Sequence, residues 1–238
     1  MDNTSPLTQL RGKGRDSRPG SRFEMERMEM IALLRRRGIR DERLLEAMRI
    51  VDRELFVQGP FVNRAYEDSA LPIGNSQTIS QPYTVAFMTD AHSLAEGDKV
   101  LEVGTGSGYQ AAILAAMGAR VFTIERHMDL LVQARKIFDR LGYQVASKGG
   151  DGTIGWKEFA PFDGIVVTAG APEAPPPLLD QLKEDGRLVI PIGDLDIQNI
   201  HIITRTRGEF EARVVDGFKF VPLIGRKGWQ KPPLRHDW

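Results

Sequence analysis

Between Lys99 and Ile190 the chain alternates short apolar runs with stretches of helical spacing, and this alternation constrains the fold more than any other feature. Apolar runs bounded by turn-forming residues predict strands, and the amphipathic stretches between them predict helices. Strands that alternate with helices at this pitch form βαβ units, which place a parallel sheet between two layers of helices. The expected strands are Val100–Val103, Val121–Ile124, Tyr143–Ser147, Gly164–Thr168 and Leu188–Ile190, and the expected helices are Tyr109–Met117, Met128–Leu141 and Pro177–Leu182.

The segment after Pro191 breaks this alternation. Two strand-like runs, Asn199–Thr206 and Ala212–Val221, are separated only by Arg207-Gly208-Glu209, with no helix between them. A short connection of this kind, containing a glycine, joins antiparallel neighbours. The predicted fold class is therefore α/β: a Rossmann-like, doubly wound sheet that is mostly parallel and ends in a C-terminal antiparallel hairpin, with helices before it.

The chain before the sheet shows helical spacing. A first helix is expected over Phe23–Arg37 and ends at Gly38, a usual C-cap residue, and Asp41 can cap a second helix. The periodicity then fades over Tyr66–Tyr83, where turn-forming and hydrogen-bonding residues gather, and a helical pattern returns near Val85. A polar stretch of this length inside a compact domain is either a poorly ordered linker or a functional loop.

Composition limits the classes of function and the division of the chain. The formal net charge is zero, so no global field favours nucleic acid or an anionic membrane as the main partner. The chain has no cysteine, no apolar run near the ~18 residues that cross a bilayer, and no apolar signal core in residues 1–22, so we expect a cytoplasmic protein. We expect a disordered basic tail over 1–22, an N-terminal helical region with the polar loop over 23–95, and a cofactor-binding α/β domain over 96–238.

A glycine-rich turn follows the first strand of the alternating region. The strand ends in Glu102-Val103, the turn reads Gly104-Thr105-Gly106-Ser107-Gly108, and a helix follows, which is the layout of a nucleotide-type cofactor site. A dinucleotide site has the spacing GxGxxG, whereas Tyr109 stands here where its third glycine would be. A carboxylate suits a ligand with ammonium and sulfonium groups better than it suits a pyrophosphate. The turn therefore favours S-adenosylmethionine over NAD, with Glu102 and the five turn residues as its contacts.

Two further acidic residues end the next strands. Glu125 lies 21 residues after Gly104, which is the distance at which an acidic residue holds a ribose diol, and Arg126 is assigned to the same site. Asp151 and Gly152 follow the third strand, where Asp151 could accept a hydrogen bond from an adenine amine. Acidic residues at three successive strand ends, together with the GxGxG turn, predict an S-adenosylmethionine-dependent methyltransferase of class I.

The sequence also resembles the protein-L-isoaspartate O-methyltransferases, from about Arg43 to Gly228. The most specific match is the polar loop, and the glycine turn is common to many methyltransferases. The matching segments are Leu71-Pro72-Ile73-Gly74, Gln77-Thr78-Ile79-Ser80-Gln81-Pro82, Val100 to Gln110, Gly150-Asp151-Gly152, Phe162 to Ala169, Leu179 to Leu182, Leu188 to Gly193 and Phe220-Val221-Pro222-Leu223.

This resemblance implies methylation of the α-carboxylate of L-isoaspartyl residues in damaged proteins, with S-adenosylmethionine as donor. It also implies that Ser80 is the active-site residue. A carboxylate acceptor is already ionised at neutral pH, so orientation and desolvation matter more than a general base. Ser80 and Thr78 can donate hydrogen bonds that orient it, and Thr168, at the end of a strand, faces the same crevice. The chain departs from the family at Ser76, where glycine is frequent, and at Tyr83, where many members have histidine.

Three alternatives stay open at this point. The first is a class I methyltransferase that acts on RNA or a small molecule, which the basic residues of the tail would help. The second is an NAD-dependent oxidoreductase, which the glycine spacing and Glu102 oppose. The third is a non-catalytic module that binds a partner through the N-terminal helices. No metal site is expected, because the four histidines are scattered without ligand spacing.

Overall fold

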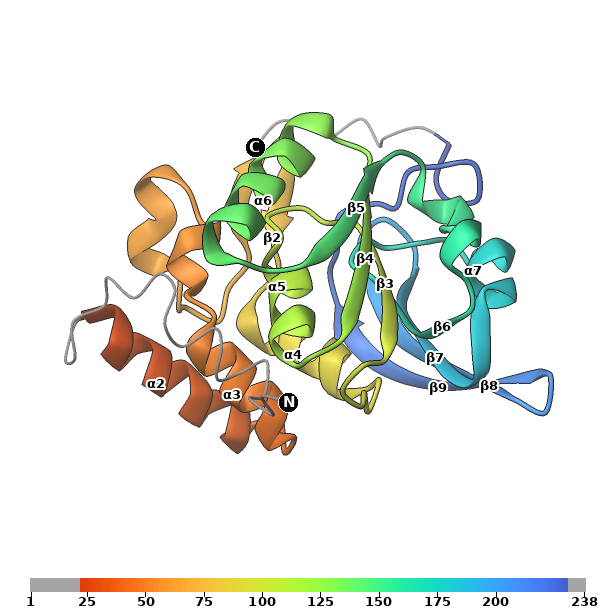
Figure 1. Ribbon diagram of the computed structural model, residues 1–238, viewed down its shortest axis with the longest axis horizontal. Helices are drawn as coiled ribbons and strands as arrows, with labels where there is room; N and C mark the ends of the chain where they lie inside the picture. The colour runs from red at the N-terminus through yellow and green to blue at the C-terminus, as the bar shows by residue number, and fades with distance from the viewer. Residues whose placement is uncertain (1–21, 231–238) are drawn as a thin grey trace, which may run out of the picture.

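The computed structural model describes residues 22–230, which form a seven-stranded sheet in the order β5-β4-β3-β6-β7-β8-β9 (Figure 1). The first five of these strands pair in parallel and β8 is antiparallel to both of its neighbours. This confirms the predicted doubly wound sheet with an antiparallel hairpin. The strands are β3 (Lys99–Val103), β4 (Arg120–Glu125), β5 (Val145–Gly149), β6 (Phe162–Val167), β7 (Leu182–Gly193), β8 (Gln198–Thr206) and β9 (Glu209–Phe218).

Helices cover both faces of the sheet, as the alternation predicts. Successive residues of β3 point to opposite faces, so Val100 belongs to one hydrophobic core and Leu101 to the other. One face carries α5 (Tyr109–Ala116) and α6 (Met128–Leu141), and the second core includes α7 (Pro176–Asp180). Two short 3₁₀ helices, η3 (Gly152–Ile154) and η4 (Lys157–Phe159), lie between β5 and β6 in the chain.

The N-terminal region packs onto the first of these faces. It comprises α2 (Arg22–Arg36), α3 (Glu42–Ile50), η1 (Arg53–Phe56), η2 (Gly59–Arg64) and α4 (Pro82–Asp90). Asp41 caps α3 as predicted, because its carboxylate accepts hydrogen bonds from the amides of Arg43 and Leu44. Buried residues of α2, α3 and α4 share one hydrophobic core with α5 and α6. The boundary near residue 95 stays a prediction, and the tail predicted for 1–22 lies outside the described residues except for Arg22.

The segment predicted as an irregular polar loop contains a small antiparallel hairpin instead. It consists of β1 (Leu71–Gly74) and β2 (Gln77–Ile79), joined by Asn75 and Ser76 with φ of +50° and +54°. Strands of four and three residues are too short to show a period, and their proline, glycine and asparagine resemble a loop. The Asn75 side chain donates a 2.6 Å hydrogen bond to Asp129, which ties the hairpin tip to the first turn of α6.

Three of the predicted strands also have wrong boundaries, and one of them, β7, begins at Leu182, six residues before the predicted Leu188. The strand expected over Tyr143–Ser147 begins and ends two residues later, as β5, and the last strand ends at Phe218 and does not reach Val221. The last strand ends early because of a tertiary contact. After Gly217, with φ of +92°, the chain leaves the sheet edge, and the Val221 carbonyl accepts a 2.7 Å hydrogen bond from the amide of Gly170.

Candidate active site

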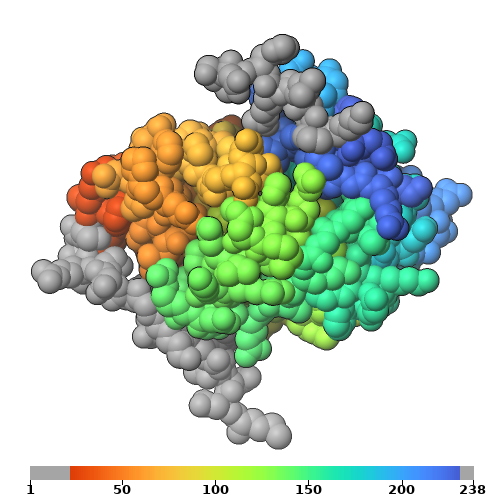
Figure 2. All heavy atoms as spheres, turned by 90° about the horizontal axis from the view of Figure 1, so that it is seen from above, coloured from red at the N-terminus to blue at the C-terminus, as the bar shows by residue number. Residues whose placement is uncertain are grey.

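A cavity lies at the carboxyl ends of β3 and β6, where the direction of strand addition reverses. Ligands of open α/β sheets bind at this reversal point. The cavity encloses about 870 Å³ of space, its open mouth included, and residues of β2, the glycine turn, α5 and the segment 221–224 line it. Figure 2 looks down on this end of the sheet. The yellow-orange segment with the hairpin, the green segment with α6 and the blue end of the described chain adjoin there.

The structure brings most of the predicted site residues to this one cavity. Two of them, Gly108 and Asp151, are not among the residues that line it. The predicted residues that do line it are Thr78, Ser80, Glu102, Gly104, Thr105, Gly106, Ser107, Glu125, Arg126, Gly152 and Thr168. Their individual roles stay predictions, and the geometry around each one limits what it can do.

Glu102 is a fully buried carboxyl at the end of β3. Its Oε2 accepts a 2.5 Å hydrogen bond from Thr123, its direct neighbour on β4, and the hydroxyls of Thr123 and Thr105 lie 2.6 Å apart. Its Oε1 is buried without a hydrogen-bond partner among residues 22–230. Burial and, to a smaller extent, the charge of Glu125 raise the pKa of Glu102 to about 8. A cation in the cavity would favour the ionised form of this carboxyl.

Glu125, at the end of β4, holds the glycine turn. One carboxylate oxygen accepts a 2.8 Å hydrogen bond from the amide of Gly106, and the other accepts a 2.9 Å bond from the amide of His127. The side chain is buried and still lines the cavity. Because each carboxylate oxygen can accept more than one hydrogen bond, these two contacts leave acceptor capacity for the predicted ribose hydroxyls.

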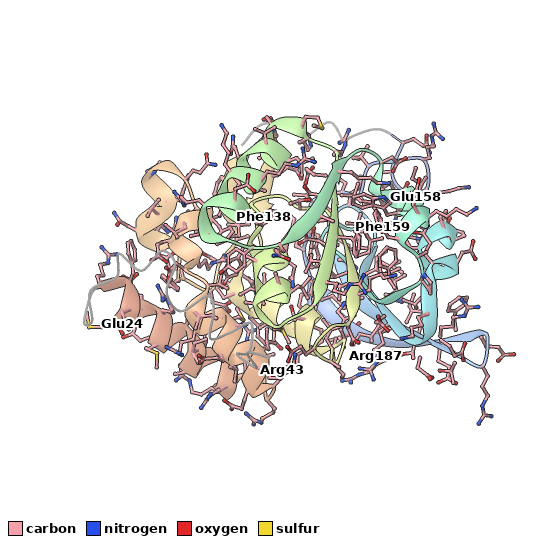
Figure 3. The ribbon with its side chains drawn as sticks, in the orientation of Figure 1. Glu24, Arg43, Phe138, Glu158, Phe159 and Arg187 are labelled. Atoms are coloured by element: carbon pink, nitrogen blue, oxygen red, sulfur yellow. The ribbon has the colours of Figure 1, made fainter. Side chains whose placement is uncertain are left out.

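Two glycines of the turn are required by close packing. Gly104 has φ of +100°, and a Cβ there would meet the Thr168 hydroxyl at 2.4 Å. That hydroxyl donates a 2.7 Å hydrogen bond to the Gly104 carbonyl, so Thr168 fixes the base of the turn. Gly108 has φ of +89°, and a Cβ there would meet the Phe138 ring at 2.8 Å. Phe138 lies on α6, labelled in Figure 3, so the third glycine serves the packing of α6 on the turn.

The Asp151 carboxylate already accepts three hydrogen bonds from neighbouring residues. Its carboxylate accepts hydrogen bonds of 2.9 and 2.6 Å from the amide and hydroxyl of Thr153, and one of 2.8 Å from the amide of Arg226. The bond to Arg226 holds the C-terminal segment of the described chain in place. Residues 221–224 of this segment line the cavity. In the sequence, Phe220 to Leu223 stand out only through the family resemblance. A contact between residues 75 positions apart leaves no local pattern.

Thr78 and Ser80 line the same cavity as the glycine turn. Thr78 lies on β2 and Ser80 directly follows it, ahead of the proline that opens α4. Arg53, which contacts the backbone of Ser80, was not predicted from the sequence. Arg53 is fully buried, and its Nη2 donates a 2.7 Å hydrogen bond to the Ser80 carbonyl. The available signal was weak: Arg53 is one of several charged residues in a mixed stretch without clear periodicity.

Residues 22–230 contain neither a cluster of metal-binding side chains nor a membrane-spanning helix. No three histidine, aspartate or glutamate side chains come together as a metal would require within this part of the chain. In the same residues, no helix has both the length and the apolar character needed to cross a bilayer.

The doubly wound sheet and the cavity at its reversal point define a class I, Rossmann-like methyltransferase. A family model described as protein-L-isoaspartate(D-aspartate) O-methyltransferase matches residues 25–228. The chain therefore belongs to this family, and the resemblance seen in the sequence is confirmed.

Individual relatives agree with this assignment. The protein-L-isoaspartate O-methyltransferase of Pelodictyon phaeoclathratiforme (strain DSM 5477 / BU-1) is 52% identical over 208 residues, which are 87% of this chain and 94% of the relative. That of Chlorobaculum tepidum is 53% identical over 206 residues, 86% of this chain and 96% of the relative. A Plasmodium falciparum structure assigned to the same enzyme, in complex with S-adenosyl-L-homocysteine, has a TM-score of 0.73 at 28% identity and covers 82% of this chain and 97% of its own.

Proposed function

We propose that this chain transfers the methyl group of S-adenosylmethionine to the α-carboxylate of L-isoaspartyl residues in damaged proteins, as a first step in their repair. One observation carries the proposal. The glycine turn and the hydroxyl-bearing residues Thr78 and Ser80 line one and the same cavity. The family that the chain belongs to supports the same substrate class.

The donor side of the cavity fits S-adenosylmethionine, which when bound supplies a methyl group activated by a sulfonium. Gly104 and Gly106 both line the cavity, so the backbone of the turn can contact a ligand directly. The buried, unpartnered Oε1 of Glu102 would accept from the ligand's amino group, and Glu125 would accept from its ribose hydroxyls. No step of this proposal needs a metal ion.

The acceptor side suits an anion. The lining residues from the hairpin and from the C-terminal segment are Gln77, Thr78, Ile79, Ser80, Val221, Pro222, Leu223 and Ile224, all uncharged. An ionised carboxylate therefore meets no negative side chain there, while both acidic lining residues, Glu102 and Glu125, lie at the strand ends on the donor side.

The reaction then needs little proton chemistry from the protein. The carboxylate is already deprotonated at neutral pH, and its oxygen attacks the methyl carbon as the carbon–sulfur bond breaks. Ser80 and Thr78 donate hydrogen bonds that orient the carboxylate for in-line approach, which is the main contribution available to them. The methyl ester that forms is expected to close to a succinimide, which reopens in part to normal aspartate.

A labelled-methyl assay with a matched peptide pair tests the proposal. The protein should label an isoaspartyl peptide and leave the aspartyl peptide of the same sequence unlabelled. Equal labelling of both peptides would contradict the proposed substrate, and labelling of RNA in place of both would favour the RNA alternative.

Two serine variants separate the walls of the cavity. Ser80→Ala should lower turnover on the isoaspartyl peptide and leave the affinity for S-adenosylhomocysteine unchanged. Ser107→Ala, on the donor wall, should act mainly on that affinity. Unchanged turnover in Ser80→Ala would mean that Ser80 only stabilises its own loop.

The setting of the activity is part of the proposal. A chain without cysteine suits the reducing cytoplasm, and its zero formal charge gives no support to nucleic acid as a partner.

A further inference from the structure

Arg53 is the largest fully buried side chain among the described residues, and no step above uses its charge. It opens η1, and its guanidinium donates two hydrogen bonds to main-chain carbonyls. Nε donates to Ala65 over 2.7 Å, and Nη2 donates to Ser80 over the same distance. Because both acceptors are backbone atoms, Arg53 fixes the path of the backbone at these two residues.

These two carbonyls flank the hairpin. The chain leaves the helical region at Ala65, runs through β1 and β2, and returns at Ser80. One guanidinium therefore joins both ends of the segment that carries Thr78. The planar fork of arginine directs separate N–H groups at two acceptors, which the compact ammonium of lysine cannot reproduce.

The same guanidinium also contacts the donor side of the cavity. Its Cζ lies 4.7 Å from the centroid of the Tyr109 ring, and Phe56 of the same 3₁₀ helix packs edge-on against that ring at 5.5 Å. Tyr109 is the first residue of α5, directly after the glycine turn, and it lines the cavity. Arg53 thus connects the acceptor hairpin to the element that follows the donor site.

Keeping a cation at this position is unfavourable by itself. Residues 22–230 supply no carboxylate in an ion pair with Arg53, and burial lowers its pKa, although a guanidinium stays protonated in proteins. The two carbonyls and the Tyr109 ring compensate only part of the hydration free energy that the guanidinium loses. An apolar residue at this position would have no such desolvation cost. The fork geometry explains why an arginine occupies the position.

We propose that Arg53 is a positioning residue for the acceptor: it holds Ser80 and the hairpin against Tyr109, so that the hydroxyls face the donor site. The inference rests on the proposed function. Without the two hydrogen bonds of Arg53, the hairpin occupies its binding position for only a fraction of the time. The KM for the peptide then rises by the inverse of that fraction. Arg53 reaches the donor side through the Tyr109 ring, but the contacts of Glu102, Thr168 and Gly106 do not involve it, so the affinity of the donor site should change little.

Arg43 provides a matched control. Its Nη1 and Nη2 donate to the carbonyls of Leu94 and Met117 over 2.9 and 2.6 Å, so it also joins two backbone segments through one fork. Neither carbonyl belongs to a residue that lines the cavity, and Figure 3 shows Arg43 at the end of the molecule opposite the hairpin. Arg53→Lys and Arg43→Lys therefore make the same chemical change in and away from the acceptor site.

The experiment compares these two variants of the whole chain. Steady-state kinetics with an isoaspartyl peptide, calorimetry with S-adenosylhomocysteine, and hydrogen exchange of the hairpin amides are measured for each. Loss of a charge-assisted hydrogen bond predicts that Arg53→Lys raises the KM for the peptide about 10- to 100-fold. Its kcat should change less than its KM, its S-adenosylhomocysteine affinity should stay within about twofold, and its residues 71–80 should exchange faster. Arg43→Lys should match the wild type in all three measurements.

Three outcomes would overturn the proposal. One is an unchanged KM in Arg53→Lys, and another is an equal loss of peptide and S-adenosylhomocysteine binding. The third is failure of Arg53→Lys to fold when Arg43→Lys folds, which would assign Arg53 to general stability. Each differs from failure of the proposed function, in which the wild type itself would not methylate the isoaspartyl peptide.

Discussion

Replacing Glu102 by glutamine should make folding less sensitive to pH above neutrality. In the folded protein burial raises the pKa of Glu102 to about 8, whereas the unfolded chain has the ordinary value of 4.5. Between these two values the folded state holds a proton that the unfolded state has released. The stability associated with this proton is fully present below the lower pKa and is lost as the pH rises through about 8.

The size of the effect follows from that interval. Each pH unit in which the folded state holds one extra proton removes about 1.4 kcal/mol of stability. From about pH 6 to pH 8, two units with partial titration near the upper end, the wild type should lose about 2 kcal/mol through Glu102. Glutamine resembles the protonated carboxyl and cannot titrate, so Glu102→Gln should lack this loss. Contributions from the histidines are common to both proteins and cancel in the difference.

Urea denaturation at the two pH values measures the difference directly. The free energy of unfolding should fall by about 2 kcal/mol less in Glu102→Gln than in the wild type over this range. Glu209→Gln, at an exposed position of β9, controls for loss of a formal charge and should follow the wild type. Equal pH dependence in Glu102→Gln and the wild type would refute the assigned burial and the raised pKa.

Three further predictions concern the same site. Binding of S-adenosylhomocysteine at pH 7 should release about 0.9 protons in the wild type and none from this position in Glu102→Gln. The reason is that a bound ammonium favours the ionised carboxyl of Glu102. Calorimetry in buffers of different ionisation enthalpy counts the released protons. Ser76→Gly should raise the stability by about 0.5–1 kcal/mol, since Ser76 has φ of +54°, and an unchanged melting temperature would argue against strain in this turn. Gly108→Ala should lower the stability by about 2–4 kcal/mol because of its φ of +89° and the clash with Phe138; Phe138→Leu in the same chain should recover part of the loss, and additive losses in urea denaturation would show that the two positions are not in contact.

Some expectations succeeded because their causes are local. The βαβ alternation appears in the period of the apolar residues, so strands such as β3 and β4 were placed within a residue or two. The GxGxG turn lies in one short stretch, and the strand ends bring Glu102 and Glu125 to the same edge in any sheet of this topology. The hairpin was missed because its strands of four and three residues show no period, although Thr78 and Ser80, which line the cavity, were predicted as site residues.

The sequence by itself determined the parallel sheet, and it predicted a donor site at the glycine turn and, through resemblance, an acceptor site at the polar loop. Only the tertiary structure decided how the surrounding residues are used. The Asp151 carboxylate binds a backbone amide 75 residues away, and Arg53 holds carbonyls 12 and 27 residues along the chain. A side chain that bonds to distant backbone atoms can do so beside almost any sequence, so it leaves no motif at the acceptor. Its partners are set by the packing of α3, η1 and α5 into one core, which the chain completes only when it folds.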